Sequence, residues 1–252
     1  AEERQPAPGA PPGRAAGLLL ALQHLEERGL RERRRQPPQS PAAQSQKLRE
    51  LGRDEKIYDL YFWEDVLQEE GHGGKVVVCQ VRNSEQPGHF PYVMKIRSKD
   101  SLRGCEEQFR HSQERMLNLL PHPGVMPIHE ILEDAKHYYI VMEKACGGTL
   151  LEGLVDSFKD GCMPVLAVKK LMREILDAVS HLHRQGVLHR DIKPDNIVMH
   201  TAADPSSPHG LTNRARLIDF DLVDTELMSS TPSQEDTFVG TLRFNAPETL
   251  LG

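Results

Sequence analysis

The segment LHRDIKPDNIVMH, residues 188–200, constrains the fold of this chain more than any other stretch. Within eight positions it places a group of charged or polar residues that includes His189, Arg190, Asp191, Lys193 and Asn196. Apolar residues stand on both sides of this group, and charges of both signs held between apolar stretches must be paired or used. The pattern therefore predicts a binding or reaction site, with a salt-bridged loop as the plainer alternative.

Composition excludes several classes of protein. The chain has 252 residues, 38% of them hydrophobic, which is enough for one large domain or two lobes with a core. The net charge of −6 argues against nucleic acid as the main partner. The apolar run at residues 17–22 is too short to cross a bilayer, so no membrane span is expected. The four cysteines are widely spaced, which favours an intracellular, cytoplasmic setting.

The chain divides into three regions by composition. Residues 1–50 are rich in Pro, Ala, Gln, Arg and Glu, which predicts a disordered N-terminal arm. Residues 58–143 carry the runs of β-branched residues, and after Gly147 the apolar residues recur at helical spacing, so residues 144–252 form a second lobe. The fold class expected is α+β: a sheet-rich lobe with one helix, followed by a mainly helical lobe.

Individual elements follow from the same patterns. Strands are predicted at Lys75–Val81, Tyr92–Ile96 and Tyr138–Met142. Helices are predicted at Cys105–Leu120, Leu150–Phe158 and Pro164–His183. The polar segment Thr201–Arg214 contains Pro and Gly, and we expect an exposed hairpin loop there.

Three side chains of the opening segment suit the transfer of a charged group. Asp191 can accept a proton from a hydroxyl group or orient it, and Lys193 can neutralise a phosphoryl group. Asn196 offers a carbonyl oxygen to a hard cation. One turn thereby supplies a base, a cation and a metal ligand, and this predicts a catalytic site at Asp191, Lys193 and Asn196.

Five motifs follow one another in a fixed order. They are EGHGGKV at residues 70–76, YVMKI around Lys95, HRDIKPDN, IDFD and APE. This set resembles the eukaryotic protein kinases, of the serine/threonine type, over roughly residues 58–252. The spacing of the hinge and the loops is similar to that of the calcium/calmodulin-dependent group. The resemblance implies the bilobal kinase fold, with ATP and Mg²⁺, or Mn²⁺, as cofactors and protein Ser/Thr hydroxyls as acceptors.

The resemblance also implies roles in nucleotide binding. Gly71, Gly74 and Val76 fit the last positions of the phosphate-binding glycine loop, with Glu69 in place of its first glycine. A plain glycine-rich turn is the alternative for this motif alone. Lys95 would contact the α- and β-phosphates and pair with a helix residue, which is Gln113 without a gap or Glu114 with a one-residue deletion.

The hinge and the metal site are implied in the same way. The main chain of Glu143 and Ala145 would bind the adenine edge, behind which Met142 would stand. Asn196 and Asp219 would hold Mg²⁺. Asp221 replaces the glycine of the DFG motif, which leaves either a stiffer but competent site or altered metal use.

The activation loop carries two further expectations from the resemblance. Thr237 stands three residues before Gly240, where a phosphate could pair with Arg190. Thr241 would pack near Asp191 and Lys193, an arrangement that fits Ser/Thr acceptors.

The chain ends four residues past Glu248, before the further helices of the family's lower lobe. We therefore expect a fragment or a truncated product, with exposed apolar surface beneath residues 164–199. The function implied is serine/threonine protein kinase activity. The alternative is a weak or inactive kinase-like module for nucleotide binding or scaffolding.

Overall fold

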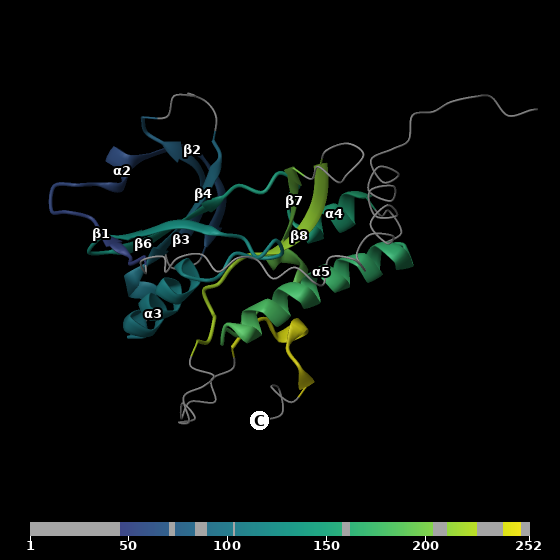
Figure 1. Ribbon diagram of the computed structural model, residues 1–252. Coiled ribbons are helices and arrows are strands. Elements are labelled where there is room, and N and C mark those ends of the chain that lie inside the picture. Colours follow the sequence, from purple (N-terminus) through teal and green to yellow (C-terminus); the bar gives the residue numbers. More distant parts are fainter. Residues whose placement is uncertain are drawn as a thin grey trace, which may run out of the picture.

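The computed structural model describes residues 46–70, 74–83, 90–102, 104–157, 162–203, 211–225 and 239–247 (Figure 1). One part is built on a sheet, and the other consists of two helices with a two-stranded hairpin. Within the described residues, no helix has the length and apolar character needed to cross a membrane.

The larger sheet has six strands in the order β1-β5-β6-β4-β3-β2. Their bounds are Arg49–Glu50 for β1, Tyr61–Glu70 for β2, Gly74–Val81 for β3, Tyr92–Ser98 for β4, Ile128–Glu133 for β5 and His137–Glu143 for β6. All neighbouring pairs are antiparallel except β1 and β5, which run parallel. The register places Val76 opposite Lys95, so both side chains share one face of the sheet.

Two helices accompany this sheet. Helix α2 is a single turn at Ile57–Leu60, and helix α3 spans Glu106–Leu117. Phe109 of α3 packs on Tyr138 of β6, with ring centroids 5.2 Å apart, and joins a buried cluster with Leu48, Ile131 and Ile140. Figure 1 shows α3 lying along one side of the sheet. Apolar burial on that side therefore fixes the helix near the strands that carry Lys95.

The helical part contains α4 at Leu150–Ser157 and α5 at Val165–Arg184, with β7 at Ile197–Ala203 and β8 at Leu211–Leu217. Two reciprocal bonds cap the first turn of α4: Thr149 N–H donates to Glu152 Oε2 at 2.7 Å, and Glu152 N–H donates to Thr149 Oγ1 at 3.2 Å. Short 3₁₀ turns occur at Lys99–Leu102 (η2), Pro194–Asn196 (η3) and Leu242–Phe244 (η4).

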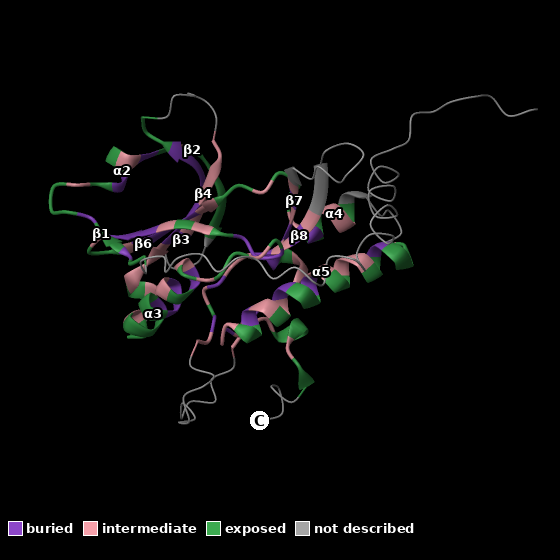
Figure 2. Ribbon diagram, viewed as in Figure 1, coloured by how far each residue is buried: buried purple, intermediate pink, exposed green. Residues whose placement is uncertain are grey.

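Helix α5 has two apolar stripes. Ile175, Ala178 and Leu182 face the core, as their spacing of three and four residues requires. The second stripe is exposed and consists of Val165, Val168, Met172 and Leu176. Figure 2 shows stretches of exposed residues, in green, along this helix. The expectation of exposed apolar surface beneath residues 164–199 is confirmed for α5.

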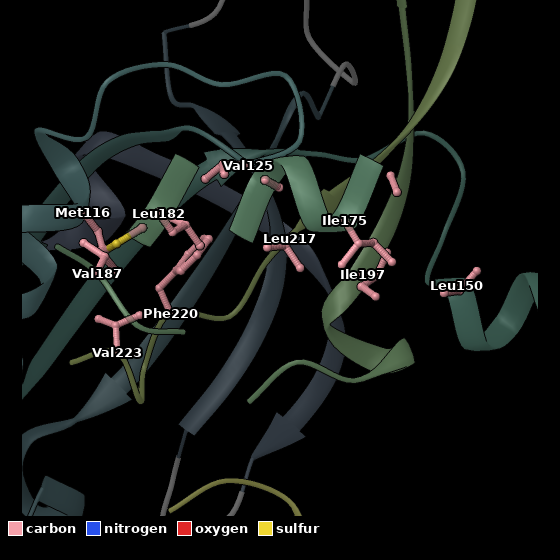
Figure 3. Close-up of a cluster of buried hydrophobic side chains, with 12 residues drawn as sticks. Met116, Val125, Leu150, Ile175, Leu182, Val187, Ile197, Leu217, Phe220 and Val223 are labelled. Atoms are coloured by element: carbon pink, nitrogen blue, oxygen red, sulfur yellow. The ribbon is translucent and has the colours of Figure 1, made fainter. Parts of the chain in front are cut away.

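A second buried cluster joins the two parts of the molecule (Figure 3). Met116 comes from α3, Leu182 from α5, and Leu217 from β8. Phe220 and Val223 follow β8 in the chain and lie in the same cluster. The segment that contains Asp219 and Asp221 is therefore anchored by Phe220 between α3 and α5.

The predicted elements agree with the structure except at three places. The predicted strands and helices are confirmed within a few residues at each end, whereas β1, β2 and β5 were not assigned individually. The expected arm at residues 1–50 extends too far, because Leu48 is buried and β1 pairs with β5; residues 1–45 lie outside the described residues. The loop expected at Thr201–Arg214 is wrong at both ends, because the β7–β8 ladder runs from Ile197↔Leu217 to Ala203↔Leu211.

Candidate functional site

Residues 188–196 link α5 to β7 and are fixed to the segment that follows β8. The N–H of Leu188 donates to the Asp224 carbonyl at 2.8 Å, and the Asp224 N–H donates to the Leu188 carbonyl at 2.9 Å. The buried ring of His189 lies 5.0 Å from the Phe220 ring, and its Nε2 lies 3.0 Å from the Ile218 carbonyl oxygen. Burial lowers the pKa of His189, so the neutral ring donates this hydrogen bond.

Arg190 is held in an unusual backbone conformation. Its φ is 63°, in the left-handed region, which non-glycine residues adopt mainly where the surrounding structure enforces it. Nε donates to the Leu222 carbonyl at 2.6 Å, and Nη1 lies 3.6 Å from Oδ2 of Asp224. This strained turn presents the next residue, Asp191, to the site.

Asp191 is surrounded by hydrogen-bond donors. Oδ2 accepts from Nζ of Lys193 at 2.8 Å and from Nδ2 of Asn196 at 2.8 Å, and Oδ1 accepts from the Thr241 hydroxyl at 2.7 Å. Burial alone would raise the pKa of Asp191, but the bonds from Lys193 and Thr241 outweigh it, so the net pKa lies below the ordinary value. The carboxylate is thus ionised at neutral pH and fixed in orientation.

The segment at residues 239–247 closes this cluster. Nζ of Lys193 donates to Oγ1 of Thr241 at 2.9 Å, so Lys193, Thr241 and Asp191 form a closed triangle. Gly240 has φ of 99°, and a Cβ there would lie 2.5 Å from the Arg190 carbonyl oxygen. A glycine is therefore required for the two segments to approach this closely. Thr241 lies beside Asp191 and Lys193, as the sequence predicted.

Main-chain contacts bring Asn196 next to Asp219. The carbonyl oxygen of Asn196 accepts the N–H of Ile218 at 3.0 Å, and Asp219 is the next residue in the chain. Asp219 has φ of 65°, so it is the second strained non-glycine residue among those described. Two hard oxygen donors, one carboxylate and one amide, are thus carried on adjoining segments.

Lys95 reaches this segment from the sheet. Its Nζ lies 2.7 Å from Oδ1 of Asp219 and 2.9 Å from Oδ2 of Asp221, and its side chain is only 8% exposed. Val76, opposite Lys95 in the ladder, is half-buried on the same face. The predicted residues Lys95, Asp191, Lys193, Asn196 and Asp219 are therefore linked by contacts into one site between the two parts of the molecule.

Asp221 adopts a role that the sequence did not reveal. Its φ is not positive, so it needs no glycine-like conformation. Its Oδ2 contacts Lys95, and Nη1 of Arg97 lies 3.6 Å from the same oxygen. Burial raises the pKa of Asp221, and Lys95 opposes this. The only sequence signal was the Lys-x-Arg spacing on a strand, which places two cations on one face.

Gln113 is the residue of α3 that faces the site. It is 2% exposed, and its Nε2 donates to the Phe220 carbonyl at 2.9 Å, whereas Glu114 is only half-buried. Gln113, the residue of the ungapped alternative, is thus the one buried toward the site, but its hydrogen bond goes to Phe220, and its pairing with Lys95 stays a prediction. A neutral amide holds the main chain of the segment that carries Asp219 and Asp221.

The remaining predicted residues lie at the edges of the site. Gly71 falls outside the described residues, while Gly74 is buried at the start of β3. Glu143 ends β6, and its carboxylate binds Arg216 at 3.0 Å and approaches His200 at 3.6 Å. Ala145, in the connection that follows, is half-buried.

A cavity of about 1310 Å³ lies against this connection and is separate from the contacts of Lys95. Its lining includes Tyr92, Met126, His129 and Cys146, and none of Lys95, Asp191, Asn196 or Asp219. The cavity therefore adjoins the candidate site, but the residues expected to act in the reaction do not line it.

The donor set fits a metal-bound nucleotide. Asp219 is 32% exposed at its side chain, and carboxylate and amide oxygens are suitable ligands for Mg²⁺. Within the described residues no cluster of three or more His, Cys, Asp or Glu could hold a metal. A cation at Asp219 and Asn196 would need further oxygen ligands, which phosphate groups and water supply in such sites. The buried ammonium group of Lys95 can bind a phosphate in place of the Asp219 carboxylate.

The expected phosphate site at Thr237 lies outside the described residues. Its expected partner Arg190 is engaged by Asp224, a pairing that was not predicted.

Residues 65–252 match the family model of the protein kinase domain. The chain is 31% identical over 162 residues to calcium/calmodulin-dependent protein kinase type 1 of Macrobrachium nipponense, covering 64% of this chain and 45% of that protein. It is 35% identical over 167 residues to serine/threonine-protein kinase cds1 of Schizosaccharomyces pombe, covering 63% and 32%. CBL-interacting protein kinase 22 of Oryza sativa subsp. japonica is 31% identical over 183 residues, covering 71% and 38%. The chain thus matches less than half the length of each relative.

Proposed function

The chain belongs to the protein kinase family, of the serine/threonine type, and from this premise we propose that it transfers the γ-phosphoryl group of ATP to Ser and Thr hydroxyls of proteins. The observation that carries the proposal is the set of contacts around Asp191. Its carboxylate is buried, ionised and held by Lys193, Asn196 and Thr241. A carboxylate held in this way can orient an incoming hydroxyl group and accept its proton.

Lys193 acts on the group that is transferred. Its ammonium group lies 2.8 Å from Asp191, so it is close to the position where the hydroxyl would attack. A cation at that position stabilises the negative charge of the transferring phosphoryl group, and positioning with charge neutralisation supplies most of the acceleration in this reaction class. Base and cation are held together by Thr241.

Asn196 and Asp219 would hold Mg²⁺, with Mn²⁺ as an alternative, and Lys95 would bind the α- and β-phosphates. The metal ion neutralises phosphate charge when it is bound. Before nucleotide enters, Lys95 and Asp219 satisfy each other's charge at 2.7 Å. Gly71, Gly74 and Val76 would cover the phosphates, and the main chain of Glu143 and Ala145 would bind the adenine edge.

The test is a γ-phosphate transfer assay on the full-length protein beside Asp191→Asn, with Mg²⁺ and Mn²⁺ compared. The substitution keeps the size of the side chain and removes its charge, so we expect transfer to fall by at least about 100-fold. Equal phosphorylation by both proteins would assign the activity to a contaminant and contradict the proposal.

A non-catalytic kinase-like module that binds nucleotide or acts as a scaffold is the second candidate. Two observations favour it: Gln113 supplies no charge to Lys95, and Asp221 replaces a glycine next to the expected metal ligand. Nucleotide binding without transfer in the same assay would support this module.

We also propose that the protein acts in the cytoplasm on protein substrates. All four cysteines are described, and each is free, which fits a reducing compartment.

A further inference from the structure

Two carboxylates compete for the ammonium group of Lys95. Nζ lies 2.7 Å from Oδ1 of Asp219 and 2.9 Å from Oδ2 of Asp221. Asp219 is the residue that we assign to the metal, so a bound cation would share the negative charge of its carboxylate with Lys95 and weaken this ion pair. The side chain of Asp221 is more deeply buried than that of Asp219, 13% exposed against 32%. Asp221 is therefore the carboxylate left beside Lys95 when Asp219 engages a cation.

Two cationic side chains of strand β4, Lys95 and Arg97, contact the Asp221 carboxylate. Residues two apart on a strand face the same side, so Lys95 and Arg97 both point toward this carboxylate. Nη1 of Arg97 lies 3.6 Å from the oxygen that Lys95 contacts. A buried carboxylate needs such partners, and two cations on one strand fix its position.

The main chain around Asp221 is fixed as well. On one side, Gln113 donates to the Phe220 carbonyl at 2.9 Å, and the Phe220 ring lies in the buried cluster. On the other side, Asp224 and Leu188 exchange two main-chain hydrogen bonds. The carboxylate therefore projects from a rigid segment by one short side chain.

Helix α3 provides no negative charge at its buried position facing the site. Gln113 is its buried residue facing the site, and a neutral amide cannot supply the negative charge that an ammonium group requires. Helix α3 therefore contributes a neutral hydrogen bond to the main chain at Phe220. The negative charge beside Lys95 comes from Asp221 instead.

We propose that Asp221 is a positioning residue that orients Lys95 toward the nucleotide, in place of a carboxylate on α3. This role rests on the proposed function, whereas the reactivity of Lys95 can be measured whether or not phosphoryl transfer occurs. It assigns a purpose to the departure from glycine at residue 221, and it makes the position of Lys95 depend on the segment that carries Asp219.

The test measures the reactivity of Lys95 directly in the full-length protein. An acyl phosphate of ATP transfers its acyl group to a lysine amine near the phosphates, with ATP as the leaving group, and mass spectrometry of the Lys95 peptide measures the rate. The variants are Asp221→Asn, Asp221→Gly, Gln113→Glu, and Asp221→Gly combined with Gln113→Glu. Asp54→Asn is the matched control, because it removes one exposed carboxylate elsewhere.

We expect Asp221→Asn and Asp221→Gly to lower the rate of Lys95 labelling about 10-fold, as misplacement of a positioned group does. Gln113→Glu should restore labelling of the Asp221→Gly protein to within about threefold of the original, because it returns the charge from the helix. Asp54→Asn should label normally. Recovery in the double variant separates positioning from a loss of folding.

Three results would overturn the proposal. Labelling of Asp221→Asn at the original rate would show that Lys95 needs no charge from Asp221. Failure of the double variant to recover, when Gln113→Glu alone labels at the original rate despite losing the bond to Phe220, would show that the charge is not the cause. A variant with normal labelling but a raised Mg²⁺ requirement would make Asp221 a metal ligand instead. If phosphoryl transfer is absent while the labelling pattern holds, only the proposed function fails.

Discussion

The hydroxyl group of Thr241 donates to Oδ1 of Asp191 at 2.7 Å, although fifty residues separate them in the chain. The same oxygen of Thr241 accepts a hydrogen bond from Lys193 at 2.9 Å. One small side chain therefore fixes both the carboxylate and the ammonium group on which the proposed transfer depends. This contact also attaches the segment at residues 239–247 to the site.

Thr241→Val keeps the shape of the side chain and removes its hydroxyl group. We expect kcat for phosphoryl transfer to fall about 10-fold, because Asp191 and Lys193 lose the group that holds them in register. Steady-state kinetics on the full-length protein measure this, and Thr241→Ser, which retains the hydroxyl, is the control. Equal losses in both variants would point to packing of the methyl group instead.

Leu182 on the buried stripe of α5 and Leu176 on its exposed stripe give a matched comparison. Leu182 is 0% exposed in the cluster of Figure 3, and Leu176 is 60% exposed. Leu182→Ala should lower the free energy of unfolding by about 2–5 kcal/mol, since it leaves a cavity. Leu176→Ala should change it by no more than about 0.5 kcal/mol. Urea unfolding followed by circular dichroism would contradict the assignment of the two faces if both variants behaved alike.

His122 should make stability depend on pH. Burial and the adjacent His181 lower the pKa of His122, and Asp177, 3.4 Å away, opposes them. In the unfolded chain the ring takes up a proton near its ordinary pKa of about 6.5, whereas the native ring resists it to lower pH. The free energy of unfolding should therefore be constant above that pH and decrease as the pH falls below it.

His122→Asn tests this dependence. An Asn oxygen can replace Nδ1 as the acceptor of the Gly124 N–H bond, 3.1 Å in length, but it does not titrate. Unfolding measured between pH 5 and pH 8 should show a smaller slope in the variant. A slope remains, since burial also lowers the pKa of His189 and His200. An unchanged slope would exclude His122 as a contributor.

Asp224 pairs with Arg190, the residue that an activating phosphate would bind. It lies 3.6 Å from Arg190 in a partly exposed pair, and such pairs contribute about 0–1 kcal/mol. A phosphate at Thr237 would have to displace it. We expect Asp224→Asn to increase the stimulation by Thr237 phosphorylation about threefold, measured as the activity ratio of phosphorylated to dephosphorylated protein. The same ratio in both proteins would argue against competition for Arg190.

Local patterns were sufficient for most elements and for the segment at residues 188–196. The β-branched runs of β3, β4 and β6 and the periodicity of α5 predict their own structure. Strand β1 was missed because Arg49 and Glu50 are exposed and polar, and only pairing with β5 makes them a strand. The ends of β7 and β8 were missed because the Pro and Gly within residues 201–214 indicated a loop over the whole segment, while the backbone ladder continues to Ala203↔Leu211.

The pairing of Asp221 with Lys95 could not be read from the sequence. The two residues lie on different parts of the molecule, and the distance between them depends on how Phe220 packs against α3 and α5. The choice between Gln113 and Glu114 was open for the same reason, since neighbouring helix positions differ by a rotation that only packing settles. Tertiary contacts therefore decided the partner of Asp221 and which of the two helix residues is buried.

The spacing of Lys95 and Arg97 limits where the chain can tolerate insertions and deletions. Because side chains alternate along a strand, one residue inserted between them would turn Arg97 to the other face of β4. The Asp221 carboxylate would then keep one cation and lose the other. Length variation between related proteins should accordingly fall in the connection at residues 82–91, between β3 and β4, and spare the interval from Tyr92 to Ser98.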